Sequence, residues 1–208
     1  MRWNGEEYFF PRMETERLFL RPFSVADTDA LFLLLRDEKT NRFLPWFPCK
    51  TEKETEIFLK ERMLYSEDCC FIAICEKTDG VPIGYVSIRS DESHDLGYAV
   101  RRELWGHGIA TEACSAVIRQ IKRRGIPYLT ATHDVKNPAS GAVMKKLGMT
   151  YRYSYREFWQ PKGIFTVFRI YQIDLKDGAV TYQACWNRYP EYWIEKVWQG
   201  RQILQRLP

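Results

Sequence analysis

A glycine-rich segment at residues 104–113, with the sequence LWGHGIATEA, is the part of the chain best suited to hold a charged ligand. Alternating residues before it predict a strand, and the spacing of apolar residues after it predicts a helix. Glycine lets the backbone approach an anion closely, and the first amides of a helix have no acceptor within the helix. Those amides and the helix dipole favour phosphate. Two glycines in so short a stretch also fit a turn with a purely structural role.

Two common phosphate-binding loops do not fit this segment. A dinucleotide-binding loop has a third glycine at the position of Thr111 and follows a strand of a βαβ unit, whereas the strands here are predicted to form a meander. A Walker loop contains Gly-Lys-Ser or Gly-Lys-Thr, which is absent from the sequence. The segment therefore argues against a nucleotide-dependent kinase and against an oxidoreductase.

Composition and charge exclude several other classes. The chain of 208 residues is 45% hydrophobic and 28% charged, without an apolar run long enough to span a bilayer. Glu6 and Glu7 stand where a signal peptide would be apolar, so we expect a cytoplasmic protein. The cysteines and histidines are too scattered to predict a disulfide framework or a metal site. A net charge of +4 does not indicate a nucleic-acid partner.

The elements that must position the glycine loop follow from periodicity, capping residues and turns. Before the loop, strands are expected at residues 17–23, 71–76, 83–89 and 95–101. Asp79-Gly80 predicts an antiparallel hairpin between the second and third of these strands. Ser24 with Asp27 is a capping signal for a helix after the first strand, and a second helix is expected after Thr51.

After the loop, the pattern predicts helix, strand, helix and a closing hairpin. The first helix is expected from Ile109 to about residue 124, with Gly125 as its end, and the second begins at Asn137 with Pro138 in its first turn. The remaining strands are expected at residues 128–132, 149–159 and 165–175. The order predicts a mixed α/β fold whose strands meander first and cross over later.

The last part of the chain, residues 176–208, differs in composition from the rest. It contains three tryptophans, several tyrosines and basic residues, with a helical pattern near residues 192–207. Exposed aromatic patches of this kind are uncommon in monomers. We therefore expect this tail to be helical and to pack against the domain or against a second subunit in a homodimer.

Residues 105–113 resemble the pyrophosphate loop of the GNAT acetyltransferases. The family pattern has Gln or Arg, then two residues, Gly, one residue, and Gly or Ala. Gly108 and Ala110 match it, while Trp105 replaces the Gln or Arg, and an aromatic residue before the glycine is usual in the Rim-like branch. That branch acetylates the N-termini of ribosomal proteins.

The resemblance extends over residues 13–175 in the expected order. It includes ETERLFLRP at residues 14–22, Gly97-Tyr98, the pair Asn137 and Ser140, and KLG at residues 146–148. It implies an α+β GNAT fold, with a mostly antiparallel, twisted central sheet and helices on both faces. Residues 1–12 are then an N-terminal extension, and the tail at residues 176–208 has no counterpart.

The resemblance also implies an acetyl-CoA site without a metal. Backbone amides from Gly106 to Thr111 would hold the pyrophosphate, and the strand ending at Val100 would separate from its neighbour so that pantetheine can add beside it. An amide near Ala99 or Val100 would polarise the thioester carbonyl. The residues expected to contact acetyl-CoA are Tyr98, Ala99, Val100, Trp105, Gly106, His107, Gly108, Ile109, Ala110, Thr111, Asn137 and Ser140.

A base is needed because an amine must lose a proton before it attacks. Asp95 is the first candidate, since Rim-like proteins commonly carry Glu at this position. Asp91, Glu92 and His94 are neighbouring alternatives. An acidic turn on the surface, without a catalytic role, fits the same residues.

The proton donor to the leaving thiolate is less clearly marked. Many GNAT members use a Tyr seven residues after the asparagine, and this chain has Met144 there. Ser140 and Asn137 are the remaining candidates. Asn137 also fits a plain helix cap.

The family implies an acyltransferase, an N-acetyltransferase that moves the acetyl group of acetyl-CoA to a primary amine by direct attack. The amine acceptor is a small molecule or a protein N-terminus. Its selection is expected to lie in loops, for which residues 43–48 and the hairpin near Lys162 are candidates, although the aromatic residues at 43–48 also fit packed core positions. The alternative is an acyl-CoA-binding sensor or interaction module without turnover, which the missing Tyr at position 144 would fit.

Overall fold

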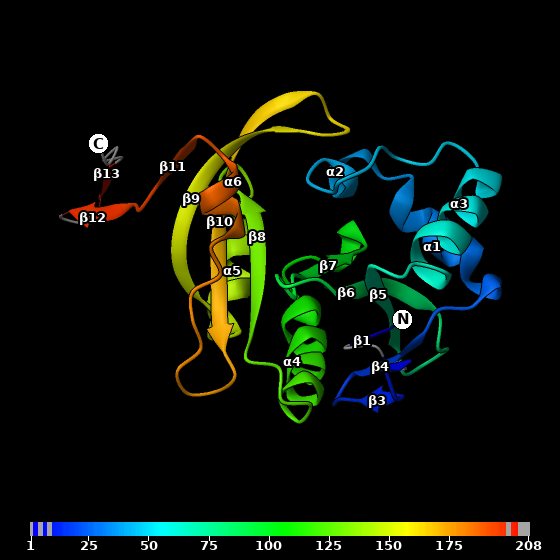
Figure 1. Cartoon of the computed structure of the whole chain (residues 1–208). Helices are drawn as coiled ribbons and strands as arrows, with labels where there is room; N and C mark the ends of the chain where they lie inside the picture. The colour runs from blue at the N-terminus through cyan, green and yellow to red at the C-terminus, as the bar shows by residue number, and fades with distance from the viewer. Residues whose placement is uncertain (1, 4–5, 8–9, 199–200, 204–208) are drawn as a thin grey trace.

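The computed structural model describes residues 2–3, 6–7, 10–198 and 201–203, and Figure 1 shows its elements. Of its two larger sheets, the first has the strand order β3-β4-β5-β6-β7 and consists of β3 (Met13–Glu14), β4 (Leu18–Pro22), β5 (Cys69–Glu76), β6 (Pro82–Arg89) and β7 (Leu96–Val100). The second has the order β11-β9-β10-β8 and consists of β8 (Tyr128–Asp134), β9 (Thr150–Trp159), β10 (Ile164–Asp174) and β11 (Glu191–Trp193). All the strand pairs of both sheets are antiparallel.

Helices cover both faces of the first sheet. One face packs against α4 (Ile109–Lys122), while α5 (Pro138–Lys146) lies against α4 and against β8 of the second sheet. The other face is covered by α1 (Thr28–Leu35), α3 (Glu52–Phe58) and the π-helical turn η2 (Leu59–Leu64), with the connecting segments. The short elements η1 (Val25–Asp27) and α2 (Glu38–Asn41) precede and follow α1. The mixed α/β fold with helices on both faces is therefore confirmed.

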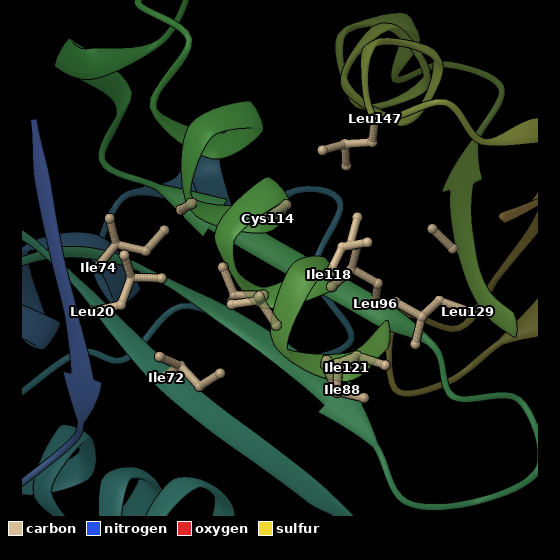
Figure 2. Close-up of a cluster of buried hydrophobic side chains, with 14 of the residues drawn as sticks. Leu20, Ile72, Ile74, Ile88, Leu96, Cys114, Ile118, Ile121, Leu129 and Leu147 are labelled. Atoms are coloured by element: carbon tan, nitrogen blue, oxygen red, sulfur yellow. The ribbon is translucent and has the colours of Figure 1, made fainter. Parts of the chain in front are cut away.

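The alternation of strand residues divides the core into two layers. In β5, Ile72 and Ile74 join the layer under α4, whereas Ala73 and Cys75 join the layer under α1, as the period of two along a strand requires. Figure 2 shows the α4 side, where the sheet residues lie against Ile118 and its helical neighbours. Burial on both faces fixes the register of the sheet, because a slip of one residue would exchange the two layers.

Several elements predicted from capping residues and turn residues are present in the structure. Ser24 and Asp27 make a capping box, and Thr51 accepts a hydrogen bond from the amide of Glu54 at the start of α3. β5 and β6 form the predicted antiparallel hairpin. Before β3, the short strands β1 (Arg2–Trp3) and β2 (Glu6–Glu7) pair with each other. Phe10, which the sequence placed in an extension, is buried in the main core.

The two sheets separate between β7 and β8. Each of these strands is the edge of its own sheet, and they are not paired with each other. The chain passes from β7 through η3 (Arg102–Leu104) and the glycine turn into α4, which leads on to β8. The predicted separation of the strand that ends at Val100 is thus present, and it leaves one edge of β7 open.

The tail departs from its prediction. Its helix is α6 (Ala184–Arg188). The predicted helix near residues 192–207 is wrong for the described residues, which form β11, β12 (Lys196–Trp198) and β13 (Arg201–Ile203); residues 199–200 and 204–207 lie outside the described part. β11 pairs with β9 and extends the second sheet. The exposed edge of β9 offers unpaired backbone groups, and Trp, Tyr and Val favour strands, so tertiary pairing overrides the helical spacing.

Candidate active site

A cleft of about 820 Å³ is lined by both sheets, by the glycine turn and by α5. Most residues expected from the sequence lie in its wall: Asp95, Tyr98, Ala99, Val100, Trp105, Gly106, Gly108, Ile109, Ala110, Thr111, Asn137 and Ser140. His107 is not part of this wall. It is exposed, and its Nδ1 lies 2.9 Å from the carbonyl oxygen of Trp105.

The glycine turn presents backbone amides at the start of α4. Gly106 and Gly108 have φ angles of 80° and 78°, in the left-handed region that favours glycine. Gly108 is the N-cap, and in the described part of the chain the first α4 amide with a backbone acceptor is that of Glu112, which donates to Gly108 O at 3.0 Å. The amides of residues 109–111 precede it at the positive end of the helix, an arrangement that binds phosphate.

A clamp of three residues, which the sequence analysis missed, holds this turn in place. Glu112 accepts hydrogen bonds from the backbone N–H of Arg17 at 3.0 Å, from Arg17 Nε at 2.7 Å and from Thr15 Oγ1. Arg17 Nη1 also donates to the carbonyl oxygen of His107 at 2.9 Å. Burial by itself would raise the pKa of Glu112, but the hydrogen bonds from Thr15 and Arg17 outweigh it, so the pKa is lowered. No local spacing could signal this contact, because the partners are 95 residues apart.

The hydrogen bonds between β6 and β7 determine which groups face the open edge. Arg101 N–H donates to Ile83 O at 2.9 Å, and Arg89 N–H donates to Asp95 O at 3.1 Å. In an antiparallel pair, alternate residues turn both backbone groups toward the partner strand. The odd-numbered residues of β7 therefore bond to β6, and the even-numbered ones turn N–H and C=O toward β8.

This alternation selects between the two candidate amides for the thioester carbonyl. Ala99 is paired with Tyr85, so its N–H is directed toward β6. Val100 directs its N–H toward the cleft, and its C=O accepts a hydrogen bond from Trp105 Nε1 at 2.8 Å. Val100 is the better candidate, and the indole of Trp105 fixes the end of the strand beside the turn.

Asp95 stands immediately before β7, where the two sheets diverge. Its Oδ1 accepts hydrogen bonds from Thr132 Oγ1 at 2.9 Å and from Thr130 Oγ1 at 3.2 Å, both on β8. Burial raises the pKa of Asp95 to about 6, although the two threonines act in the opposite direction. The carboxylate is therefore ionised at neutral pH and yet is a stronger base than an ordinary aspartate.

The alternative bases lie elsewhere. Asp91, Glu92 and His94 are absent from the wall of the cleft, as far as the described residues go. Asp91 instead pairs with Arg89, with Oδ2 at 2.6 Å from Nε. Of the four candidates, the structure brings Asp95 to the site and leaves the others outside it.

A pair of hydroxyl groups joins β7 to α5. The hydroxyl of Tyr98 donates to the carbonyl oxygen of Ser140 at 2.8 Å and lies 2.9 Å from Ser140 Oγ. Tyr98 has one proton and a carbonyl can only accept, so the proton on Ser140 Oγ remains for Tyr98 or for a ligand. Asn137 caps α5 by accepting from the amide of Ser140 at 3.3 Å. Met144 is buried and offers no acidic proton.

Aromatic side chains, most of which the sequence analysis did not single out, line the rest of the cleft. They are Phe43, Trp46, Phe71, Tyr85, Tyr155, Trp159 and Phe168. Of these, Phe43 and Trp46 belong to the link at residues 43–48, for which the sequence left open a substrate-facing loop or packed core aromatics. The others alternate along strands, a pattern that by itself indicates a core position.

The described residues contain no group of His, Cys, Asp and Glu side chains that could hold a metal ion. In the same part of the chain, no helix is both long enough and apolar enough to cross a membrane.

The antiparallel fold, the glycine turn at the start of α4 and the open edge of β7 are together the features of an acyltransferase of the GNAT class. The chain belongs to this family, because the family model described as an acetyltransferase (GNAT) domain matches residues 17–150. The resemblance inferred from the sequence is thereby confirmed, and the protein is an enzyme.

Relatives and solved structures agree with this assignment. The uncharacterized N-acetyltransferase YoaA of Bacillus subtilis (strain 168) is 23% identical over 171 residues, which are 79% of this chain and 97% of that protein. A GNAT acetyltransferase from Bacillus anthracis is 20% identical with a TM-score of 0.70, covering 79% of this chain and 99% of that one. RimL, a ribosomal L7/L12 alpha-N-protein acetyltransferase in complex with coenzyme A, is 22% identical with a TM-score of 0.64, covering 77% and 95%. At these identities the structures establish the shared fold.

Proposed function

We propose that this enzyme moves the acetyl group of acetyl-CoA to a primary amine, on a small molecule or a protein N-terminus, by direct attack of the amine on the thioester. One observation carries the proposal. Asp95, whose pKa burial raises to about 6, lines the same cleft as the glycine turn and the open edge of β7. A site for the donor and a base for the acceptor thus share one cavity.

The donor half of the cleft fits coenzyme A. The amides of residues 109–111 suit the pyrophosphate, and the unpaired edge of β7 suits an extended chain with amide groups of its own, such as pantetheine. Val100 N–H donates to the thioester carbonyl oxygen and stabilises the negative charge that develops there. RimL, which has the same fold, was solved with coenzyme A, which supports this choice of donor.

Asp95 acts as the general base. An alkylamine is protonated at neutral pH and attacks after it has lost a proton. The carboxylate of Asp95 accepts that proton, directly or through a water molecule. The amine nitrogen then bonds to the carbonyl carbon and the carbon–sulfur bond breaks, while the second proton of the nitrogen passes to the departing sulfur, directly or relayed by a hydroxyl group, so that coenzyme A leaves as the thiol.

Ser140 is the best-placed donor to the departing sulfur. A thiol has an unperturbed pKa of about 8.5, so the thiolate needs modest help. Ser140 Oγ carries an available proton and is positioned by Tyr98. Met144, at the position where many family members have Tyr, offers none.

Two measurements on the purified chain test the proposal: thermal stability against acetyl-CoA concentration, and thiol release with a panel of amines. A ligand that binds the native state raises the melting temperature as its concentration rises. We expect stabilisation together with thiol release that depends on the amine. Stabilisation without release would favour a binding module without turnover. No stabilisation at millimolar acetyl-CoA would contradict the donor site.

A further inference from the structure

We propose that the acceptor is a small primary amine carried on an aromatic or bulky apolar body, rather than the N-terminus of a protein. The inference rests on the proposed acetyl transfer and concerns the part of the cleft beyond Asp95. Three features of that part support it: its aromatic walls, the sign of its interior charge, and a bridge that closes it.

The walls consist of two aromatic groups, one on each sheet. On the first, Tyr85 packs against Phe71 and Trp46, with ring centroids 5.3 and 6.2 Å apart. On the second, Phe168 packs against Trp159 and Tyr155, with centroids 5.3 and 5.8 Å apart. All these side chains line the one cleft. Such walls bind flat or bulky apolar groups.

The charged residues inside this part of the cleft are acidic, whereas both acidic and basic residues lie at its exposed rim. Lys39, Arg62, Asp68 and Arg89 line the cleft but are exposed. Asp95 and Glu157 are less exposed and stand among the aromatic rings.

A third carboxylate of the lining, Asp134, is already engaged, because it accepts from Thr166 Oγ1 at 2.7 Å and from Lys136 N–H at 2.8 Å. Asp95, by contrast, accepts its side-chain hydrogen bonds within the described residues through Oδ1 alone, which leaves Oδ2 for the ligand, while Glu157 interacts with Tyr189. A cation held by a carboxylate beside aromatic faces is the ligand that this arrangement recognises. A polyamine would instead need carboxylates spaced along its whole length.

A bridge ties the two walls together. Lys162, in the turn between β9 and β10, donates to the carbonyl oxygen of Asn41 at 3.0 Å and lies 4.9 Å from the centre of the Phe47 ring. Asn41 also holds the wall itself, since its Oδ1 accepts from Trp46 Nε1 at 2.9 Å. Figure 1 shows the β9–β10 hairpin, drawn in yellow, reaching toward α2. The bridge limits entry and disfavours a terminus that is attached to a folded protein.

A comparison of three amine acceptors with the full chain tests this inference. At saturating acetyl-CoA, thiol release is measured with 2-phenylethylamine, putrescine and a tetrapeptide with a free N-terminus. We expect kcat/KM for 2-phenylethylamine to exceed the other two by about tenfold or more, the equivalent of one good aromatic contact. Trp46→Ala should remove most of that preference while leaving the KM for acetyl-CoA unchanged. Lys162→Met should raise kcat/KM for the tetrapeptide, and Lys53→Met, on an exposed helix surface, should not.

The outcomes separate this inference from the proposed function. Equal or higher kcat/KM for the tetrapeptide or for putrescine would overturn it and leave acetyl transfer intact. Calorimetric titration of 2-phenylethylamine into the chain with coenzyme A gives a second readout. If acetyl-CoA stabilises the chain but 2-phenylethylamine neither binds nor reacts, the acceptor class is wrong. If acetyl-CoA does not bind, both proposals fall.

Discussion

In the proposed mechanism, Asp95 sets the rate by accepting one proton from the amine. Asp95→Asn keeps the shape of the side chain and an oxygen for the hydroxyl of Thr132, but it removes the base. We expect kcat to fall by about a hundredfold, the usual contribution of a general base, with little change in the KM for acetyl-CoA. Steady-state thiol release measures both. A kcat within a factor of about two of the wild type would assign the base to another group or to bulk water.

The same carboxyl should link activity to pH. Wild-type kcat/KM should fall as the pH drops below about 6, where Asp95 takes up a proton. Asp177→Asn is the matched control, because Asp177 is exposed and lies outside the wall of the cleft. Its pH profile should follow that of the wild type. An identical acid limb in the Asp95→Asn variant would assign that limb to a different residue.

Asp95 should also lower stability at neutral pH. Its folded pKa of about 6 lies above the ordinary value of 3.8, so the folded state binds the proton more tightly than the unfolded state. Ionisation therefore costs stability as the pH rises from about 4 to 6, and the full cost remains above that range. Asp95→Asn should stabilise the protein at pH 8, by no more than about 3 kcal/mol, and the gain should vanish near pH 4. Urea denaturation at the two pH values checks the sign.

Replacing Ser140 should lower kcat less than replacing Asp95 does, and with a different dependence on pH. Ser140→Ala should lower kcat by less than about tenfold, because a thiolate leaves with little assistance. The deficit should shrink above about pH 8.5, where free thiols ionise without help. Tyr98→Phe keeps the ring and removes the hydroxyl that contacts Ser140. If Tyr98→Phe lowers kcat and Ser140→Ala does not, the proton comes from Tyr98.

At the scale of an element, the glycine turn works through backbone geometry. Gly108 in the turn and Gly80 in the β5–β6 hairpin both have positive φ angles, 78° and 70°, and an added Cβ would find ordinary contact or open space at each. Alanine should therefore cost a similar 1–2 kcal/mol or so at either site. Only Gly108→Ala should weaken acetyl-CoA binding, as measured by the thermal shift titration. Equal weakening by Gly80→Ala would show that lost stability, not the turn, is responsible.

At the scale of the whole molecule, the tail is part of the second sheet. Glu195 is 4% exposed and accepts from Arg169 Nε at 2.8 Å and from Ser154 Oγ at 2.7 Å. Tyr189 stacks on Tyr155, with ring centroids 4.7 Å apart. Since Tyr155 lines the cleft, the tail supports one of its walls through this stacking. A segment without a counterpart in the family resemblance thus contributes to the site.

Removing this anchor should be costly. Glu195→Ala should lower the free energy of unfolding by about 3 kcal/mol or more, as expected when a buried ion pair loses one partner. Glu191→Ala is the matched control, because Glu191 pairs with Arg156 near the surface, where a pair contributes less than about 1 kcal/mol. Urea denaturation compares the two variants. Equal losses would mean that the tail is not anchored through Glu195.

The sequence by itself determined most of the elements up to residue 175 and the glycine turn. Residues such as Gly108 and Asn137 act on backbone that is a few residues away, so their chemistry can be read locally. Alternation along β5 and β6 fixed their hairpin in the same way. The family resemblance then supplied the candidate base, Asp95.

The tertiary structure alone decided which candidates face one another. Desolvation and the threonines of β8 distinguish Asp95 from Asp91, and both depend on a strand some 35 residues away. The pairing of β7 with β6 selects Val100 over Ala99, and the open edge of β9 turns part of the tail into a strand. Burial, electrostatics and edge pairing arise from neighbours that are distant in sequence, and no local pattern contains them.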